Sequence, residues 1–110
     1  MVVGTVDEVD DIFHALADRT RRDIVERTLQ TEYSVSALAR LYPMTFAAVQ
    51  KHVVVLERAT LVTKRKRGRE MLVKGNVDAV RRAARLLDGL ESVWQARIGR
   101  MAEILGEDPA

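Results

Sequence analysis

Apolar residues recur every three or four positions along much of the chain, a spacing that predicts amphipathic helices. In residues 7–17, which we expect to form the first helix, they are Val9, Ile12, Phe13 and Leu16. Asp18 can then cap a second helix by accepting a hydrogen bond from a free backbone N–H. The apolar side of this second helix carries Ile24, Val25 and Leu29. The arginines at its start can either pair with nearby acids or contact a phosphate: Arg19, Arg21 and Arg22.

After a predicted loop at residues 31–33, residues 35–59 form two short helical segments separated by the break YPM. Ser34 can cap the first segment. Pro43 ends that segment near Leu41, because proline cannot occupy a helix interior and disfavours helical geometry in the residue before it. Thr45 can cap the second segment. Two helices joined by a tight turn are the layout of a helix-turn-helix.

The second of these helices has two different faces. The face that we expect to be buried carries Thr45, Val49, His52, Val53, Leu56 and Ala59. The opposite face carries Ala47, Gln50, Lys51, Val54 and Arg58. Gln50 can pair with adenine, Ala47 can touch a thymine methyl group, and Lys51 can reach guanine or phosphate. Taken alone, this helix could equally well be an amphipathic surface helix whose polar face is only solvated.

Residues 61–74 combine strand-forming flanks with a basic tip. Gly68 can supply the positive φ that a tight hairpin needs. The segment has six basic residues and one acidic residue, a net charge of +5, compared with +2 for the whole chain. A run of charged residues usually forms only a solvated surface, but a basic hairpin that follows a helix-turn-helix is a more specific sign of nucleic-acid binding. The pattern therefore predicts a winged helix-turn-helix that binds double-stranded DNA.

The last apolar stripe runs through residues 77–105. Asn76 can cap this helix, which would be about 43 Å long if it is continuous, and such a length is unusual in a small domain. We therefore expect a second copy of the chain to cover the stripe. The expected dimer interface consists of Val9, Ile12, Phe13, Leu16, Leu87, Leu90, Trp94, Ile98 and Met101. The alternatives are a helix that folds back over its own domain and a bend near Gly89, because glycine weakens a helix interior by ~1 kcal/mol.

The composition argues against several other functions. The chain has 110 residues and no cysteine, so we expect a single domain over residues 1–110 without disulfides or thiol chemistry. His14 and His52 are too few for a transition-metal site, so we predict no metal and no cofactor, and a hydrogen-bonded structural role for His52. No phosphate-binding loop or hydrolase motif occurs, so we expect no enzyme. No apolar run of ~20 residues and no signal peptide occur, so we expect no membrane segment and a cytoplasmic location.

Four segments together resemble the ArsR-type family of bacterial transcriptional repressors: ALADRTRRDIVERTL, VSALARL, MTFAAVQKHVVVLERATLV and the GRE of the wing. The last helix, with Trp94, resembles a branch of the family without a metal site. The resemblance covers residues 9–105. It implies a mainly α-helical winged helix-turn-helix homodimer, with one β-hairpin wing and its first and last helices at the dimer interface, that represses transcription from an inverted-repeat operator. It places the DNA contacts at Thr45, Phe46, Ala47, Gln50, Lys51, Arg65, Arg67 and Arg69.

The chain departs from the family pattern at several positions. Gln50 stands where members commonly have serine, and Val54 where they often have lysine or arginine, which puts the base contacts in doubt. Thr60 stands where glycine usually ends the helix at positive φ, a conformation that β-branched residues disfavour. An unknown small-molecule effector is one option for the inducing signal. The alternative function is a winged helix that binds protein or RNA, which would lack steeply salt-dependent binding to duplex DNA.

Overall fold

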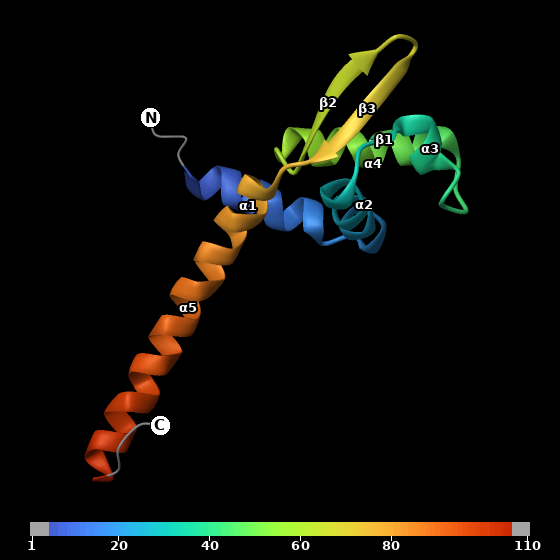
Figure 1. The fold of residues 1–110 in the computed structure, drawn as a ribbon. Coiled ribbons are helices and arrows are strands. Elements are labelled where there is room, and N and C mark those ends of the chain that lie inside the picture. The colour runs from blue at the N-terminus through green and yellow to red at the C-terminus, as the bar shows by residue number, and fades with distance from the viewer. Residues whose placement is uncertain (1–4, 107–110) are drawn as a thin grey trace.

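A computed structural model describes the chain from residue 5 to residue 106, and the side-chain environments from residue 8 onward. The structure is mainly helical with one small antiparallel sheet, as predicted (Figure 1). The elements are α1 (Thr5–Leu16), α2 (Arg19–Gln30), β1 (Tyr33–Ser34), α3 (Val35–Ala39), α4 (Phe46–Arg58), β2 (Val62–Arg67), β3 (Glu70–Gly75) and α5 (Val77–Ile104). The first helix thus begins and ends earlier than residues 7–17. Within the described part of the chain, no helix is long and apolar enough to cross a membrane.

Each predicted N-cap accepts a hydrogen bond from a backbone N–H of its helix. These caps are Asp18, Ser34, Thr45 and Asn76. At the start of α4, Thr45 Oγ1 lies 3.1 Å from the backbone N of Ala48. Helix α3 ends at Ala39, before the predicted end near Leu41, because the chain tightens there and the Leu41 N–H bonds to the Leu38 carbonyl. The polar residues before α2, α3, α4 and α5 therefore fix where these four helices begin.

The sheet has three strands in the order β1-β3-β2, so the predicted hairpin gains a third strand. Residues 31–33 were expected to form a loop, but Tyr33 pairs with Val73 and Ser34 pairs with Leu72. Two residues are too few to show strand alternation, and their partners lie about 40 positions later in the chain. Gly68 begins the hairpin turn with a φ of 61°, as predicted. The wing, defined here as β2, its turn and β3, is therefore joined at its base to the segment before α3.

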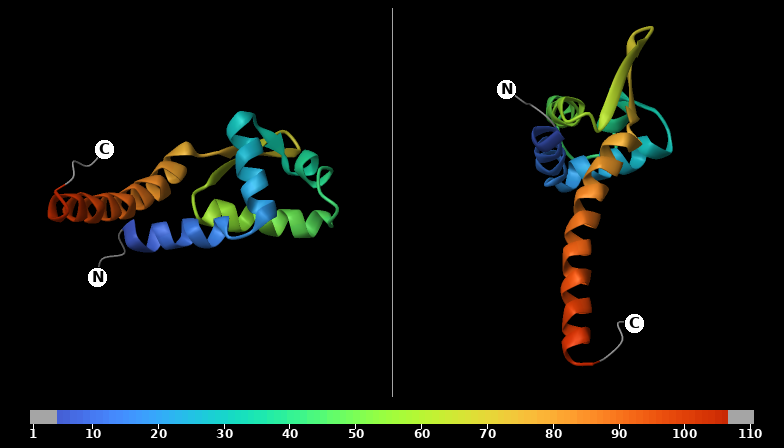
Figure 2. Two further views of the ribbon diagram at one scale, coloured as in Figure 1. Left: turned by 90° about the horizontal axis from the view of Figure 1, so that it is seen from below. Right: turned by 90° about the vertical axis from the view of Figure 1, so that its left-hand side faces the viewer.

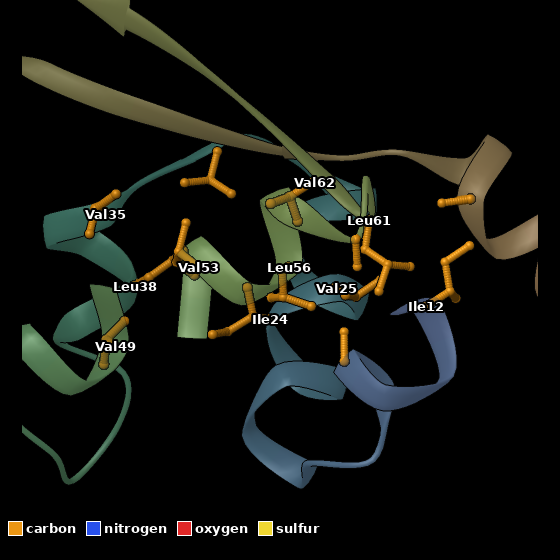
Figure 3. Packing of buried hydrophobic residues seen from close by; sticks show 14 of the residues in the cluster. Ile12, Ile24, Val25, Val35, Leu38, Val49, Val53, Leu56, Leu61 and Val62 are labelled. Atoms are coloured by element: carbon orange, nitrogen blue, oxygen red, sulfur yellow. The ribbon is translucent and has the colours of Figure 1, made fainter. Parts of the chain in front are cut away.

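One apolar core joins α1, α2, α3, α4, the sheet and the first turns of α5 (Figure 3). Ile12 was predicted to lie at a dimer interface, but its side chain is fully buried in this core, so that prediction is wrong. Val9, Phe13 and Leu16 are half-buried. On α2, Ile24 and Val25 are buried as predicted.

The third apolar residue predicted for the buried side of α2, Leu29, is exposed, and Thr28 is buried in its place. Thr28 satisfies its hydroxyl by donating a hydrogen bond of 2.7 Å to the Ile24 carbonyl. Leu29 instead packs against Gly75 at the end of β3. A Cβ atom on Gly75 would come within 2.8 Å of both Leu29 Cγ and the Leu29 backbone N. The absence of a side chain at Gly75 therefore allows α2 and β3 to approach closely.

Two of the three arginines at the start of α2 bind the end of α1. Arg21 Nε donates to the Ala15 carbonyl at 2.7 Å, and Arg22 Nη1 donates to the Leu16 carbonyl at 2.8 Å. Both carbonyls lie in the last turn of α1, where helix carbonyls lack partners within the helix and positive charge is favourable. Arg21 and Arg22 thus have a structural role in joining the two helices, and Arg19 is exposed.

Helix α5 is continuous through Gly89 and leads away from the rest of the domain (Figures 1 and 2). The wing projects in the opposite direction (Figure 2). Ala79 and Ala83, near the start of α5, are its buried residues. The structure therefore excludes both a break at Gly89 and a helix that folds back over its own domain.

Candidate nucleic-acid interface

The N-terminal half of α4 presents an exposed surface that contains all five of the predicted α4 contacts. These residues are Thr45, Phe46, Ala47, Gln50 and Lys51. The other face of the helix is anchored in the core through Val49, Val53 and Leu56, none of which has exposed surface. The periodicity of α4 therefore predicted correctly that these three residues lie inside, whereas Thr45, at the start of that face, is exposed. Whether the exposed set contacts bases stays a prediction.

A hydrogen bond between side chains helps to hold α4 against the first two helices. Arg21 Nη1 lies 3.3 Å from His52 Nδ1, while the same guanidinium also binds carbonyls at the end of α1. The prediction that His52 is a hydrogen-bonded structural residue is confirmed. Among the residues that the structure describes, no cluster of three or more His, Cys, Asp or Glu side chains is arranged to hold a metal ion.

The base of the wing is held by two ion pairs that the sequence did not predict. Arg65 makes a two-point contact with Glu32, with Nε–Oε2 at 3.0 Å and Nη2–Oε1 at 2.9 Å. Hydrogen bonding to Arg65 lowers the pKa of the Glu32 carboxyl, so Glu32 stays charged. Lys64 Nζ lies 3.1 Å from Glu57 Oε1 of α4. Arg65, a predicted DNA contact, thus has its guanidinium paired with a carboxylate in this structure, and its contact with DNA stays a prediction.

Beyond these pairs, the tip of the wing is basic and exposed. Lys66, Arg67 and Arg69 are exposed, and none of them has an ion-pair partner within the described part of the chain. Gly68 gives the tip its tight turn. The structure thus places Arg67 and Arg69 where free cations can meet a polyanion.

A groove of about 190 Å³ lies between the wing and the exposed face of α4. Phe46 and Gln50 of α4 form one side, and Arg69, Glu70 and Met71 of the wing form the other. Met71 and Glu70 were not among the predicted site residues. Met71 pairs with Lys66 of β2, so the two side chains point to the same face of the wing. Strand alternation could therefore have indicated that Met71 lies on the same face as this basic residue. The exposed face of α4 and the wing tip therefore border one groove.

The second predicted site, the stripe on α5, is exposed along its length. The predicted interface residues Leu87, Leu90, Trp94, Ile98 and Met101 are 38–61% exposed. Val93, Ile104 and Leu105 add to the same apolar surface. The Arg97 guanidinium lies 5.7 Å from the centre of the Trp94 ring. So large an apolar surface on one helix is unusual for a chain that functions alone.

Comparison with known proteins agrees with this architecture. No protein-family profile matches the chain. The chain is 33% identical over 106 residues to the HTH-type transcriptional regulator Rv2034 of Mycobacterium tuberculosis, with 96% of each chain covered. A solved structure of an ArsR-like transcriptional regulator from Rhodococcus sp. RHA1 matches with a TM-score of 0.80 and 31% identity, over 93% of this chain and 96% of that chain.

The chain belongs to the ArsR family of transcriptional regulators. A more distant solved structure is the homodimeric winged helix-turn-helix DNA-binding domain of a possible ArsR-family regulator from Mycobacterium bovis. It is 22% identical with a TM-score of 0.65, over 83% of this chain and 91% of that chain. At this identity the likeness shows the fold alone, a winged helix-turn-helix. The predicted family and fold class are therefore confirmed.

Proposed function

We propose that this ArsR-family protein binds double-stranded DNA sequence-specifically, as a homodimer on an inverted-repeat operator, and represses transcription there. The observation that carries the proposal is the groove between α4 and the wing. The hydrogen-bonding side chain of Gln50 and the free cation of Arg69 both line this groove. Base edges are distinguished by hydrogen bonding and apolar contact in the major groove, and phosphates are bound by cations, so this pairing suits duplex DNA.

The two parts of the surface have different roles in this proposal. Thr45, Phe46, Ala47, Gln50 and Lys51 face the bases and the nearby backbone. Arg67 and Arg69 lie along the phosphates, which carry no sequence information. Gln50 is the residue that discriminates most, because its amide can both donate to and accept from one adenine.

The homodimer follows from the exposed stripe on α5. One recognition helix contacts only a few base pairs, whereas two helices related by a two-fold axis contact two half-sites. Trp94, Ile98 and Met101 are large apolar side chains that lie outside the chain's own core, so a second copy of α5 can cover them. The Mycobacterium bovis protein of the same fold is itself a homodimer.

Binding to the duplex upstream of the protein's own gene and to an unrelated duplex, at several salt concentrations, tests this function. We expect tight binding to the first duplex with a steep salt dependence. Gln50→Ala should reduce the preference for the operator and leave non-specific affinity nearly unchanged. Arg67→Ala combined with Arg69→Ala should weaken binding to both duplexes and flatten the salt dependence. Equal affinity of the wild-type protein for both duplexes, or binding that does not respond to salt, would contradict the proposal and favour a protein- or RNA-interaction module.

A further inference from the structure

We propose that Arg65 and Glu32 form a clasp that sets the position of the wing, and that Arg65 is a positioning residue that does not contact phosphate. The inference rests on the proposed DNA-binding function. It assigns the phosphate contacts of the wing to the residues beyond the clasp, at the tip. Without the structure, Arg65 is indistinguishable from its basic neighbours in the sequence KRKRGR.

The Arg65 side chain runs across the sheet to reach Glu32. Arg65 lies on β2, whereas Glu32 directly precedes β1, and β3 lies between these two strands in the sheet. Leu72 of β3 pairs with Arg65 on one side and with Ser34 on the other. To meet Glu32, the Arg65 side chain must therefore cross the central strand. Leu72, which shares the face of Arg65, is only 8% exposed.

At the Glu32 carboxylate, Arg65 makes a two-point contact. Both oxygens of Glu32 accept a hydrogen bond from Arg65, one from Nε and one from Nη2, at 3.0 and 2.9 Å. This arrangement uses one edge of the planar guanidinium and fixes its orientation, which a single contact would not do. To contact a phosphate through the same edge, Arg65 would first have to leave a charged carboxylate. Glu32 also neutralises the charge that Arg65 would otherwise offer to DNA.

A neighbouring ion pair, made by Lys64, lies on the other face of the strand. Successive strand residues point to opposite faces, so Lys64 and Arg65 leave β2 in opposite directions. Lys64 binds Glu57 on α4, and Arg65 binds Glu32 before β1. The two pairs therefore hold the base of the wing from both faces, one toward the recognition helix and one toward the sheet edge. Beyond this point only Lys66, Arg67 and Arg69 remain as exposed cations of the tip.

The consequence for DNA binding is a division of roles between residues of one charge type. Replacing a residue that binds phosphate reduces the salt dependence by about 0.9 for each phosphate that is no longer neutralised, because fewer counterions are released. Replacing a positioning residue weakens binding without changing the number of phosphates neutralised. Arg65→Ala should therefore weaken operator binding by roughly 2–5-fold, the scale of an exposed ion pair, at an unchanged salt slope.

The experiment compares variants of the full chain on the operator duplex between roughly 50 and 200 mM salt. Arg67→Ala is the matched control and should flatten the slope by about 0.9 for each subunit. Glu32→Gln, which leaves Arg65 unpaired, should weaken binding as Arg65→Ala does. The charge-swapped double variant, Glu32→Arg with Arg65→Glu, should recover most of the affinity, which a phosphate contact at Arg65 would not allow. A flattened slope for Arg65→Ala, or tighter binding by Glu32→Gln, would overturn the proposal.

Amide hydrogen exchange of the free protein provides a second measurement that does not depend on DNA. The wing amides should exchange faster in Arg65→Ala than in the wild type, and the charge-swapped variant should restore their protection. Unchanged exchange in Arg65→Ala would overturn the clasp itself. If no duplex binds the wild-type protein while wing exchange still responds as expected, the clasp holds and the proposed function fails.

Discussion

Arg21 provides the sharpest test of how the helix-turn-helix is attached to the rest of the chain. Its side chain is only 14% exposed and donates to the carbonyls of Ala15 and His14, at 2.7 and 3.3 Å, and contacts His52 Nδ1 at 3.3 Å. A hydrogen bond from a charged donor contributes roughly 1.5–3 kcal/mol, and bonds that share one guanidinium are not additive. Counting the short bond fully and the two longer bonds in part, we expect Arg21→Ala to reduce the free energy of unfolding by about 2–4 kcal/mol.

Arg22 is the matched control for this substitution. It lies next to Arg21 and also caps α1, but it makes one exposed bond, to the Leu16 carbonyl at 2.8 Å. Because solvent screens this exposed bond, Arg22→Ala should reduce the free energy of unfolding by no more than about 1 kcal/mol. Urea unfolding of both variants, at one fixed protein concentration because association stabilises the folded state, measures the difference. Equal losses for the two variants would refute the argument that Arg21 joins α1, α2 and α4.

Two further substitutions test packing and electrostatics elsewhere. Gly75→Ala should destabilise the fold by about 1–3 kcal/mol, because the new methyl group would meet the Leu29 backbone at 2.8 Å. Gly99→Ala, where the new methyl group has no neighbour within 4 Å, should instead stabilise α5 by about 0.5–1 kcal/mol. Thermal unfolding that changed stability in the same direction for both variants would contradict this difference. Asp23 accepts hydrogen bonds from Tyr42 and Arg27, and these bonds lower the pKa of its carboxyl below the usual 3.8. The charged Asp23 carboxylate therefore contributes fully to the free energy of unfolding above about pH 4, and this contribution is lost as the pH falls through the lowered pKa. The stability difference between the wild type and Asp23→Asn should therefore shrink in urea titrations from about pH 7 to pH 3, and a difference that grew on acidification would contradict the assignment.

The features that the sequence predicted well depend on nearby residues. Asp18 and Thr45 act as caps because each needs only the backbone N–H three positions later, and Gly68 turns the hairpin because of its own φ. The buried face of α4 follows from helical periodicity alone. The family resemblance drew attention to Thr60, because glycine usually ends the helix at this position with a positive φ. Thr60 has a φ of 63°.

The features that the sequence did not predict depend on residues far apart in the chain. Glu32 and Arg65 are 33 positions apart, and no periodic pattern connects an acid in a loop with one cation in a basic run. β1 is defined by its pairing with β3, and two residues have no alternation of their own. Ile12 shares a helix with half-buried Val9 and Phe13, so the spacing identified the apolar side of α1 but not which residue on that side the chain's own core covers. Spacing predicts a face, and only the packed structure shows what covers it.

The central claim is that two copies of the chain, joined through α5, bind one operator. Ile98→Glu places a charge within the apolar stripe, whereas Ser92→Glu adds the same charge on the opposite side of the helix and serves as the control. Sedimentation and operator binding should be measured on the same samples at tens of micromolar protein. We predict a wild-type and Ser92→Glu dimer that binds the operator, and an Ile98→Glu monomer that does not bind it specifically although α4 and the wing are unchanged. A monomeric wild type, or a monomeric Ile98→Glu protein that binds the operator with full affinity, would contradict the account.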